Sequence, residues 1–137
     1  MAKKVQEVSS RIRTEEDFEV FKAECKRWLK IFGLTDWEIH FHFSEDCVST
    51  AAVQWEPVSR IVDVHLGHES HYSGKGTDVA KFAGRHEMLH LLLADYHVMC
   101  RARTATEEEI AKQDERLVRI LENAFEEVEN TRVCLQL

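Results

Sequence analysis

Hydrophobic side chains recur along this chain first with the period of a helix and then with that of a strand. Residues 14–32 place apolar side chains three and four positions apart and end at Gly33, so we predict an amphipathic helix there. Residues 37–43 alternate strictly between apolar and polar side chains, as a half-buried strand does. Residues 50–55 and 60–66, on either side of a turn at the only proline, predict two more strands.

Two further helices are predicted in the second half of the chain. Residues 78–95 are apolar around most of a helix, which predicts burial on nearly all sides. The last helix follows Thr106, and one stripe of it is expected to be buried: Ile110, Leu117, Leu121, Ala124, Phe125 and Val128. Together the elements predict an α+β fold in which a small antiparallel three-stranded sheet packs against helices.

The composition is that of a single domain spanning 1–137, with loose ends at 1–13 and 130–137. Of the 137 residues 44% are hydrophobic and 31% charged, with one proline and five glycines. The chain shows neither the apolar run of a signal peptide nor a segment of membrane-spanning length, so we expect a cytoplasmic protein without a membrane partner. A net charge of −7 argues against broad binding to nucleic acid. Four cysteines without a Cys-x-x-Cys pair exclude a zinc ribbon.

The clearest chemical signal is the sequence His86-Glu87-Met88-Leu89-His90. One helical turn separates the two histidines, so both imidazoles project from one face and can bind one Zn²⁺ ion. Glu87 stands beside that face, where it can take a proton from a water that the metal activates. Burying these side chains in an apolar helix without partners is unfavourable, and a metal ion satisfies all three. We therefore predict a zinc site rather than a chance arrangement of core histidines.

This motif and its uncharged neighbours Gly84 and Leu91 resemble those of the zincin metallopeptidases. The order of elements is similar to that of the minimal zincin-like domains of bacteriophage and mobile-element proteins, relatives in outline of SprT-like and ImmA-like proteins. The resemblance covers residues 15–128, although only the His-Glu-x-x-His motif is specific. It implies a zincin-like fold and peptide hydrolysis, with a strand at the edge of the sheet pairing with an extended substrate.

A catalytic zinc ion normally has three protein ligands, so a third must come from elsewhere in the chain. The metzincin pattern is not met, because Leu93 and Tyr96 stand where it requires Gly and His. Glu109 follows His90 after eighteen intervening residues, the spacing of aminopeptidase-like gluzincins. Thr106 and Glu109 also form a capping box, however, and this gives Glu109 a structural role.

Other carboxylates on the last helix compete for the same role. Asp114 lies near the centre of the apolar stripe and Glu115 at its margin. Minimal zincins of the ImmA-like type carry a glutamate followed at the third and sixth positions by apolar residues, and Glu115 with Val118 and Leu121 fits. The resemblance thus favours Glu115. The alternatives that stay open are Asp114, Glu109 and Glu107.

The sequence as a whole predicts a zinc-dependent peptidase that acts on a peptide or protein substrate. His86, His90 and Glu115 are expected to bind Zn²⁺, and Glu87 to act as general base. The alternative is a non-catalytic zincin-like module in which the metal serves folding and partner binding. Glu87 favours the enzyme, because a structural site does not require it, whereas the small size leaves little room for a deep substrate cleft.

Overall fold

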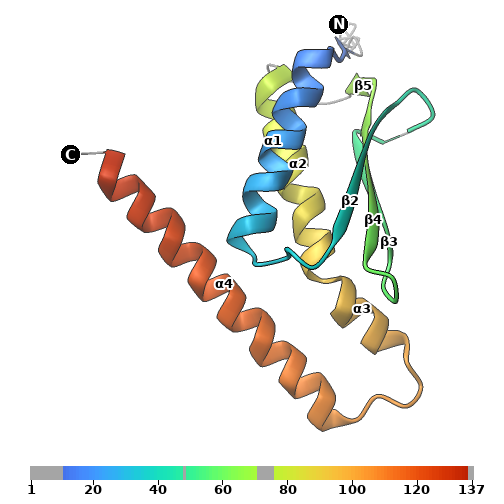
Figure 1. The fold of residues 1–137 in the computed structure, drawn as a ribbon, viewed down its shortest axis with the longest axis vertical. Helices are drawn as coiled ribbons and strands as arrows, with labels where there is room; N and C mark the ends of the chain where they lie inside the picture. Colours follow the sequence, from blue (N-terminus) through green and yellow to red (C-terminus); the bar gives the residue numbers. More distant parts are fainter. Residues whose placement is uncertain (1–10, 48, 71–75, 136–137) are drawn as a thin grey trace, which may run out of the picture.

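The computed structural model describes residues 11–47, 49–70 and 76–135. Its elements follow in this order: β1 (Arg11–Ile12), α1 (Glu15–Ile31), β2 (Glu38–Ser44), β3 (Ala51–Glu56), β4 (Ile61–Gly67), β5 (Glu69–Ser70), α2 (Gly76–Leu92), α3 (Ala94–Arg101) and α4 (Glu107–Leu135). Figure 1 shows α1 and α2 side by side against one face of the sheet, with α3 continuing from the end of α2 and α4 along the outside. The predicted α+β arrangement of helices around a small sheet is confirmed.

The main sheet is mixed, so the prediction of an antiparallel sheet was wrong. Its strand order is β2-β4-β3, with β2 parallel and β3 antiparallel to the central β4. Alternation along a strand shows which face is buried, but it does not show which strand lies alongside or in which direction. The central strand carries the core of the sheet, since Val62, Val64 and Leu66 are fully buried. Separately, β1 and β5 form a two-stranded antiparallel sheet.

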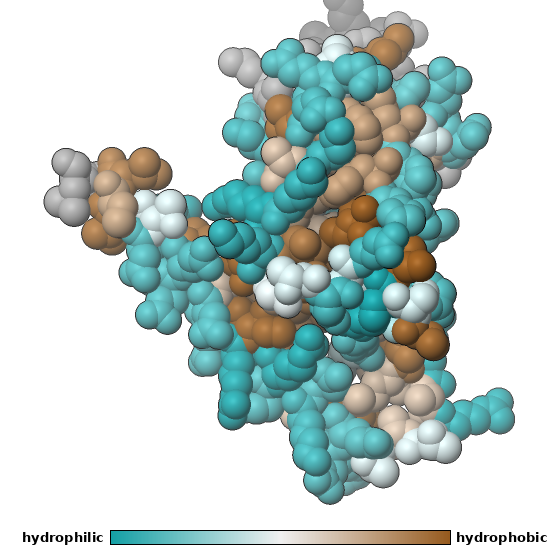
Figure 2. Space-filling model, viewed as in Figure 1, coloured by the Kyte–Doolittle hydropathy of each residue, from teal (hydrophilic) through white to brown (hydrophobic). Residues whose placement is uncertain are grey.

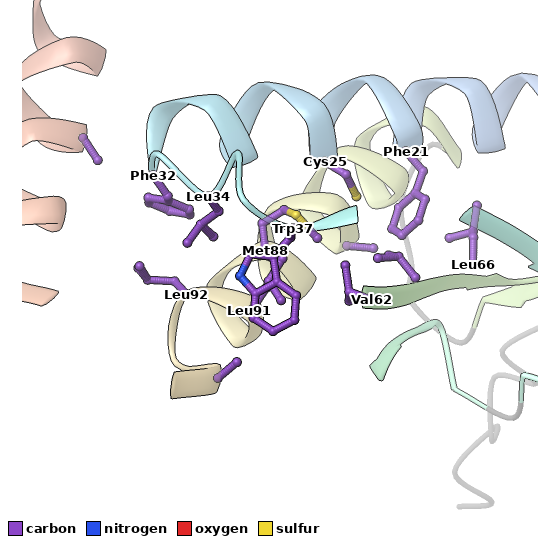
Figure 3. Close-up of a cluster of buried hydrophobic side chains, with 14 of the residues drawn as sticks. Phe21, Cys25, Phe32, Leu34, Trp37, Val62, Leu66, Met88, Leu91 and Leu92 are labelled. Atoms are coloured by element: carbon purple, nitrogen blue, oxygen red, sulfur yellow. The ribbon is translucent and has the colours of Figure 1, made fainter. Parts of the chain in front are cut away.

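The motif helix α2 is buried on one side only, and this corrects the expectation that nearly all of its surface is covered. Met88 and Leu91 enter the core shared with α1 and the sheet (Figure 3). Phe82 is 51% exposed and Leu89 37% exposed. The cause is the layer arrangement, in which α1 and the sheet cover only one side of α2. The open side is the one that presents the histidines to solvent.

Helices α1 and α2 approach closely at Gly84. A Cβ atom there would lie 3.1 Å from the Cβ of Glu24, 3.1 Å from the Phe21 carbonyl oxygen and 3.3 Å from the Cys25 nitrogen. Two of these neighbours are backbone atoms, which cannot move aside as a flexible side chain can. Gly84 therefore fixes the spacing of the two helices that carry the core.

We expect Gly84→Val to lower the free energy of unfolding by about 1–3 kcal/mol, because the new side chain must push α1 away from α2. Urea denaturation followed by circular dichroism measures this change. The control is Ala111→Val, which places the same β-branched side chain on an exposed turn of α4. Valine is a better helix former than glycine, so only close packing can make it unfavourable at position 84. A loss in Gly84→Val no larger than that in Ala111→Val would contradict the requirement for glycine at this contact.

The long helix α4 packs mainly against α3 and the end of α1. Leu117 and Ala124 are buried as predicted. Ile110 and Phe125, placed on the buried stripe by their spacing, are 36% and 65% exposed, so this part of the prediction was wrong. Figure 2 shows hydrophobic side chains where α4 meets the rest of the molecule and again at its C-terminal end. The helix includes residues 130–135, which the pattern assigned to a loose end. None of the described helices has the length and apolar character of a membrane span.

Candidate metal centre

The two motif histidines converge on the exposed side of α2. The Nε2 atoms of His86 and His90 lie 3.2 Å apart, and the ring planes are inclined by 81°. Two imidazole nitrogens bound to one tetrahedral zinc ion at the usual bond length are separated by about 3.3–3.4 Å. The spacing of the pair therefore fits a shared zinc ion, and the predicted convergence of the two side chains is observed.

The electrostatics of the two histidines also favour the binding of a metal cation. Burial lowers the pKa of His90, and the neighbouring charge of His86 lowers it further. A histidine with a lowered pKa is neutral near pH 7, and neutral imidazole is the form that binds metals. Phe82, one turn before His86, stacks against its ring with centroids 5.9 Å apart. Phe82 thus restricts the orientations open to the first histidine.

Glu87 points away from solvent, although it follows an exposed histidine. It is only 5% exposed, and burial raises its pKa from the ordinary value of 4.5 to about 7. The described residues offer its carboxylate no hydrogen bond. A carboxyl group whose pKa lies near neutrality can both accept and return a proton, as general acid-base catalysis requires.

A small cleft brings Glu87 and His86 together with strand β3. Its volume is about 250 Å³, and its lining consists of Ser49, Thr50, Ala51, Phe82, Ala83, His86 and Glu87. Helix α2 thus forms one wall, and the start of β3 with the residues before it forms the other. The cleft is small, as the length of the chain suggested, but it contains the candidate base and one candidate ligand.

The wall formed by residues 49 and 50 depends on Gly67 at the end of β4. The Gly67 amide donates a hydrogen bond to the Thr50 carbonyl at 2.9 Å. A Cβ atom on residue 67 would overlap the Ser49 carbonyl oxygen and lie 3.1 Å from that of Cys47. Glycine is therefore needed where the chain crosses the end of the central strand, and it holds one side of the cleft in place.

The structure places Glu115 away from the two histidines. Glu115 is exposed on α4, where its Oε1 accepts a hydrogen bond from Nε of Arg119 at 3.2 Å. It lines a hollow between the end of α1 and α4, together with Lys30 and Arg116. No group of three or more histidine, cysteine or carboxylate side chains suited to a metal occurs within the described ranges. The third ligand therefore stays a prediction.

The competing carboxylates are also on α4. Glu109 accepts hydrogen bonds from the amide and hydroxyl of Thr106 at 2.8 and 3.0 Å, and its own amide donates to Thr106 Oγ1 at 3.2 Å. The predicted capping box is thus present, and it explains Glu109 without a metal. Asp114 and Glu107 are exposed on the same helix.

Cys25 is a buried thiol close enough to Glu87 for its pKa to be affected by that carboxylate. Burial raises the pKa of the Cys25 thiol, and the charge of Glu87 raises it further. Its Sγ atom donates to the Gly84 carbonyl at 3.7 Å, so the thiol is used in packing α1 on α2. All four cysteines are unpaired in the structure. A protonated, buried thiol is inert, so Cys25 is not a candidate ligand.

Sequence reasoning identified His86, Glu87 and His90, but it did not identify the wall opposite them. Nothing in the spacing of Ser49, Thr50 and Ala51 marks them as part of a site, because their position follows from the strand order. Comparison of the chain with protein-family models, with curated proteins and with solved structures finds no match.

Proposed function

We propose that this protein is a zinc-dependent peptidase similar in design to the minimal zincins. The observation that supports this most strongly is the combination of His86 and His90, with Nε2 atoms 3.2 Å apart, and a buried Glu87 on the adjacent cleft. The histidines fit the spacing of two zinc ligands, and Glu87 has a pKa of about 7, near that of an efficient general base.

Each residue has a distinct role in this proposal. His86 and His90 would hold Zn²⁺, which supplies Lewis acidity toward a water molecule and a substrate carbonyl. Glu87 would accept the proton of the attacking water and deliver it to the departing amine nitrogen. The apolar surroundings that raise the pKa of Glu87 keep this carboxylate poorly solvated and therefore basic.

Strand β3 suits the binding of an extended substrate. It pairs with β4 on one side only among the described strands, and its first residue, Ala51, lines the cleft beside Glu87. The free backbone groups of an edge strand can pair with a peptide, which would then lie across the cleft with a carbonyl beside the metal. The resemblance implies that a strand at the edge of the sheet has this role. β3 lies at an edge, whereas β4, the strand directly before the motif helix in the main sheet, is central.

The alternative is a non-catalytic metal-binding module in protein interaction. The position of Glu115, ion-paired with Arg119 on α4, favours it, because two histidines alone do not complete a catalytic zinc site. The two functions differ in what they require of Glu87. Only the peptidase needs a carboxylate at this position.

We expect about one zinc ion per chain in protein purified without chelator, and loss of that zinc in His86→Ala and His90→Ala, because each removes one of two converging ligands. Elemental mass spectrometry measures the metal content. His40→Ala, which removes an exposed histidine from the sheet, should keep its zinc. Metal-free wild-type protein, even after zinc addition, would contradict the proposal.

The same measurement on Glu115→Ala tests the predicted third ligand. Loss of zinc in a folded Glu115→Ala protein would mean that α4 brings this carboxylate to the histidines when the metal binds. Retention of zinc would transfer the role to another donor, with Asp114→Ala, Glu109→Ala and Glu107→Ala as the next variants. Circular dichroism of each variant confirms that the helices are intact.

A further inference from the structure

The side of β3 that faces the helices continues beyond the cleft into a second hollow. This β3–α3 groove has a volume of about 430 Å³, and its lining consists of Val53, Gln54, Trp55, Pro57, His97, Val98 and Arg101. The cleft beside Glu87 lies at the first residue of β3, and the groove lies along the rest of the strand. One edge strand therefore connects the candidate catalytic site to a second concave surface.

The spacing along β3 relates the groove to a bound peptide. Ala51, Val53 and Trp55 point to the same side of the sheet, where all three pack against the core. A strand rises about 3.4 Å per residue, so Trp55 stands roughly 14 Å from Ala51. An extended peptide advances by the same amount per residue. A peptide whose reacting carbonyl lies beside Glu87 would therefore reach the groove three to five residues away.

The chemistry of the groove combines an apolar wall with a positive rim. Trp55 and His97 meet edge to face with ring centroids 6.0 Å apart, and Pro57 and Val98 extend the apolar surface. Val98 is 41% exposed, so part of this surface is open to a ligand.

Arg101 supplies the positive rim from the last turn of α3. No carboxylate in the described parts of the chain forms an ion pair with it. In a chain with a net charge of −7, an arginine left free beside an apolar hollow is suited to an acidic ligand.

We propose that the β3–α3 groove is a distal subsite for an extended peptide. The groove binds a bulky apolar side chain of the peptide, three to five residues from the peptide bond that is cut beside Glu87. An acidic residue of the peptide lies next to this apolar residue. The apolar side chain packs on Trp55 and Val98, and the carboxylate pairs with Arg101. This inference rests on the proposed function, because it names the class of substrate that the peptidase selects.

The cleavage profile of a proteome-derived peptide library tests this inference. Wild-type protein should cut peptides enriched in an apolar residue beside an acidic one at this distance from the bond. Arg101→Glu should remove the acidic enrichment and lower kcat/KM about tenfold for a synthetic decapeptide of the enriched sequence. For the decapeptide in which Gln replaces the acidic residue, Arg101→Glu and wild-type protein should have similar kcat/KM values. Val98→Asp should remove the apolar enrichment.

Matched controls separate the groove from general effects of charge or stability. Arg132→Glu and Val118→Asp make the same changes on exposed turns of α4, and both should leave the profile as in wild type. A wild-type profile without preference at the distal positions, or one that Arg101→Glu and Val98→Asp do not alter, would overturn the assignment of the groove.

Binding without turnover distinguishes a failure of the groove from a failure of the peptidase. A positional-scanning array of extended decapeptides, probed with Glu87→Gln protein, reports recognition without cleavage. Suppose that wild-type protein cuts no peptide, but that binding to the array depends on the acidic position and is lost when Arg101→Glu is added. This result would support the groove and reject the peptidase. Absence of both binding and cleavage would reject the groove as well.

Discussion

Glu87→Gln is expected to lower kcat for peptide hydrolysis by about 10²–10⁴-fold while zinc content and fold stay as in wild type. The amide has the size of the carboxyl group and fits the same buried position, but it cannot accept a proton. The zinc content is unchanged because His86 and His90 remain. Hydrolysis of the library-derived decapeptide, with metal content measured on the same samples, checks both parts of the expectation.

Two further variants show whether the loss reflects proton transfer. Glu87→Asp keeps a carboxylate on a shorter side chain and should recover part of the activity. Asp78→Asn removes a negative charge from the exposed start of the same helix and should have little effect. Wild-type rates of cleavage in Glu87→Gln would rule out the assigned mechanism, whatever the zinc content.

Protein held in a chelator should lose stability as the pH rises, and Glu87→Gln should remove this loss. Burial raises the pKa of Glu87 from 4.5 in the unfolded chain to about 7 in the folded state. Between these values the folded protein holds a proton that the unfolded chain has released, so the stability falls as pH increases. The full change amounts to about 3 kcal/mol and is complete above pH 7.

Urea denaturation from pH 4.5 to 8 measures this effect as the difference between wild type and Glu87→Gln. The variant should gain stability relative to wild type across this range, because glutamine does not titrate. Glu126→Gln, which changes an exposed glutamate of α4, should follow wild type at every pH. A constant difference between wild type and Glu87→Gln would show that Glu87 is not desolvated in the folded protein.

Local pattern was sufficient to find α1, α2, α4, the three strands of the main sheet and the central part of the site, but it did not find β1, β5 or the separate helix α3. The main strands begin one residue after their predicted starts, and the motif helix ends at Leu92 rather than Asp95. The pair His86 and His90 is set by helix geometry alone, which is why its convergence followed from the spacing of the motif.

The remaining features depend on contacts between distant segments. The parallel pairing of β2 with β4 could not be read from alternation, which is the same for either direction. The exposure of Phe82 and Leu89 depends on which side of α2 the sheet covers. The placement of Glu115 depends on how α4 packs, and its predicted role came from a resemblance that extends beyond the motif only in outline.

The close contact at Gly84 has a consequence for the order in which the protein folds. Cys25 Sγ contacts the carbonyl of Gly84, 59 residues further along the sequence. The apolar face of α1 is therefore covered only after α2 has formed and packed against it. The hairpin of β3 and β4 is local and can form earlier, whereas contacts this far apart carry a larger loop-closure cost. During synthesis the motif helix leaves the ribosome after α1 and the sheet. Its arrival supplies Met88 and Leu91 to the core and brings the pair His86 and His90 with them, so the core and the candidate metal site are completed together.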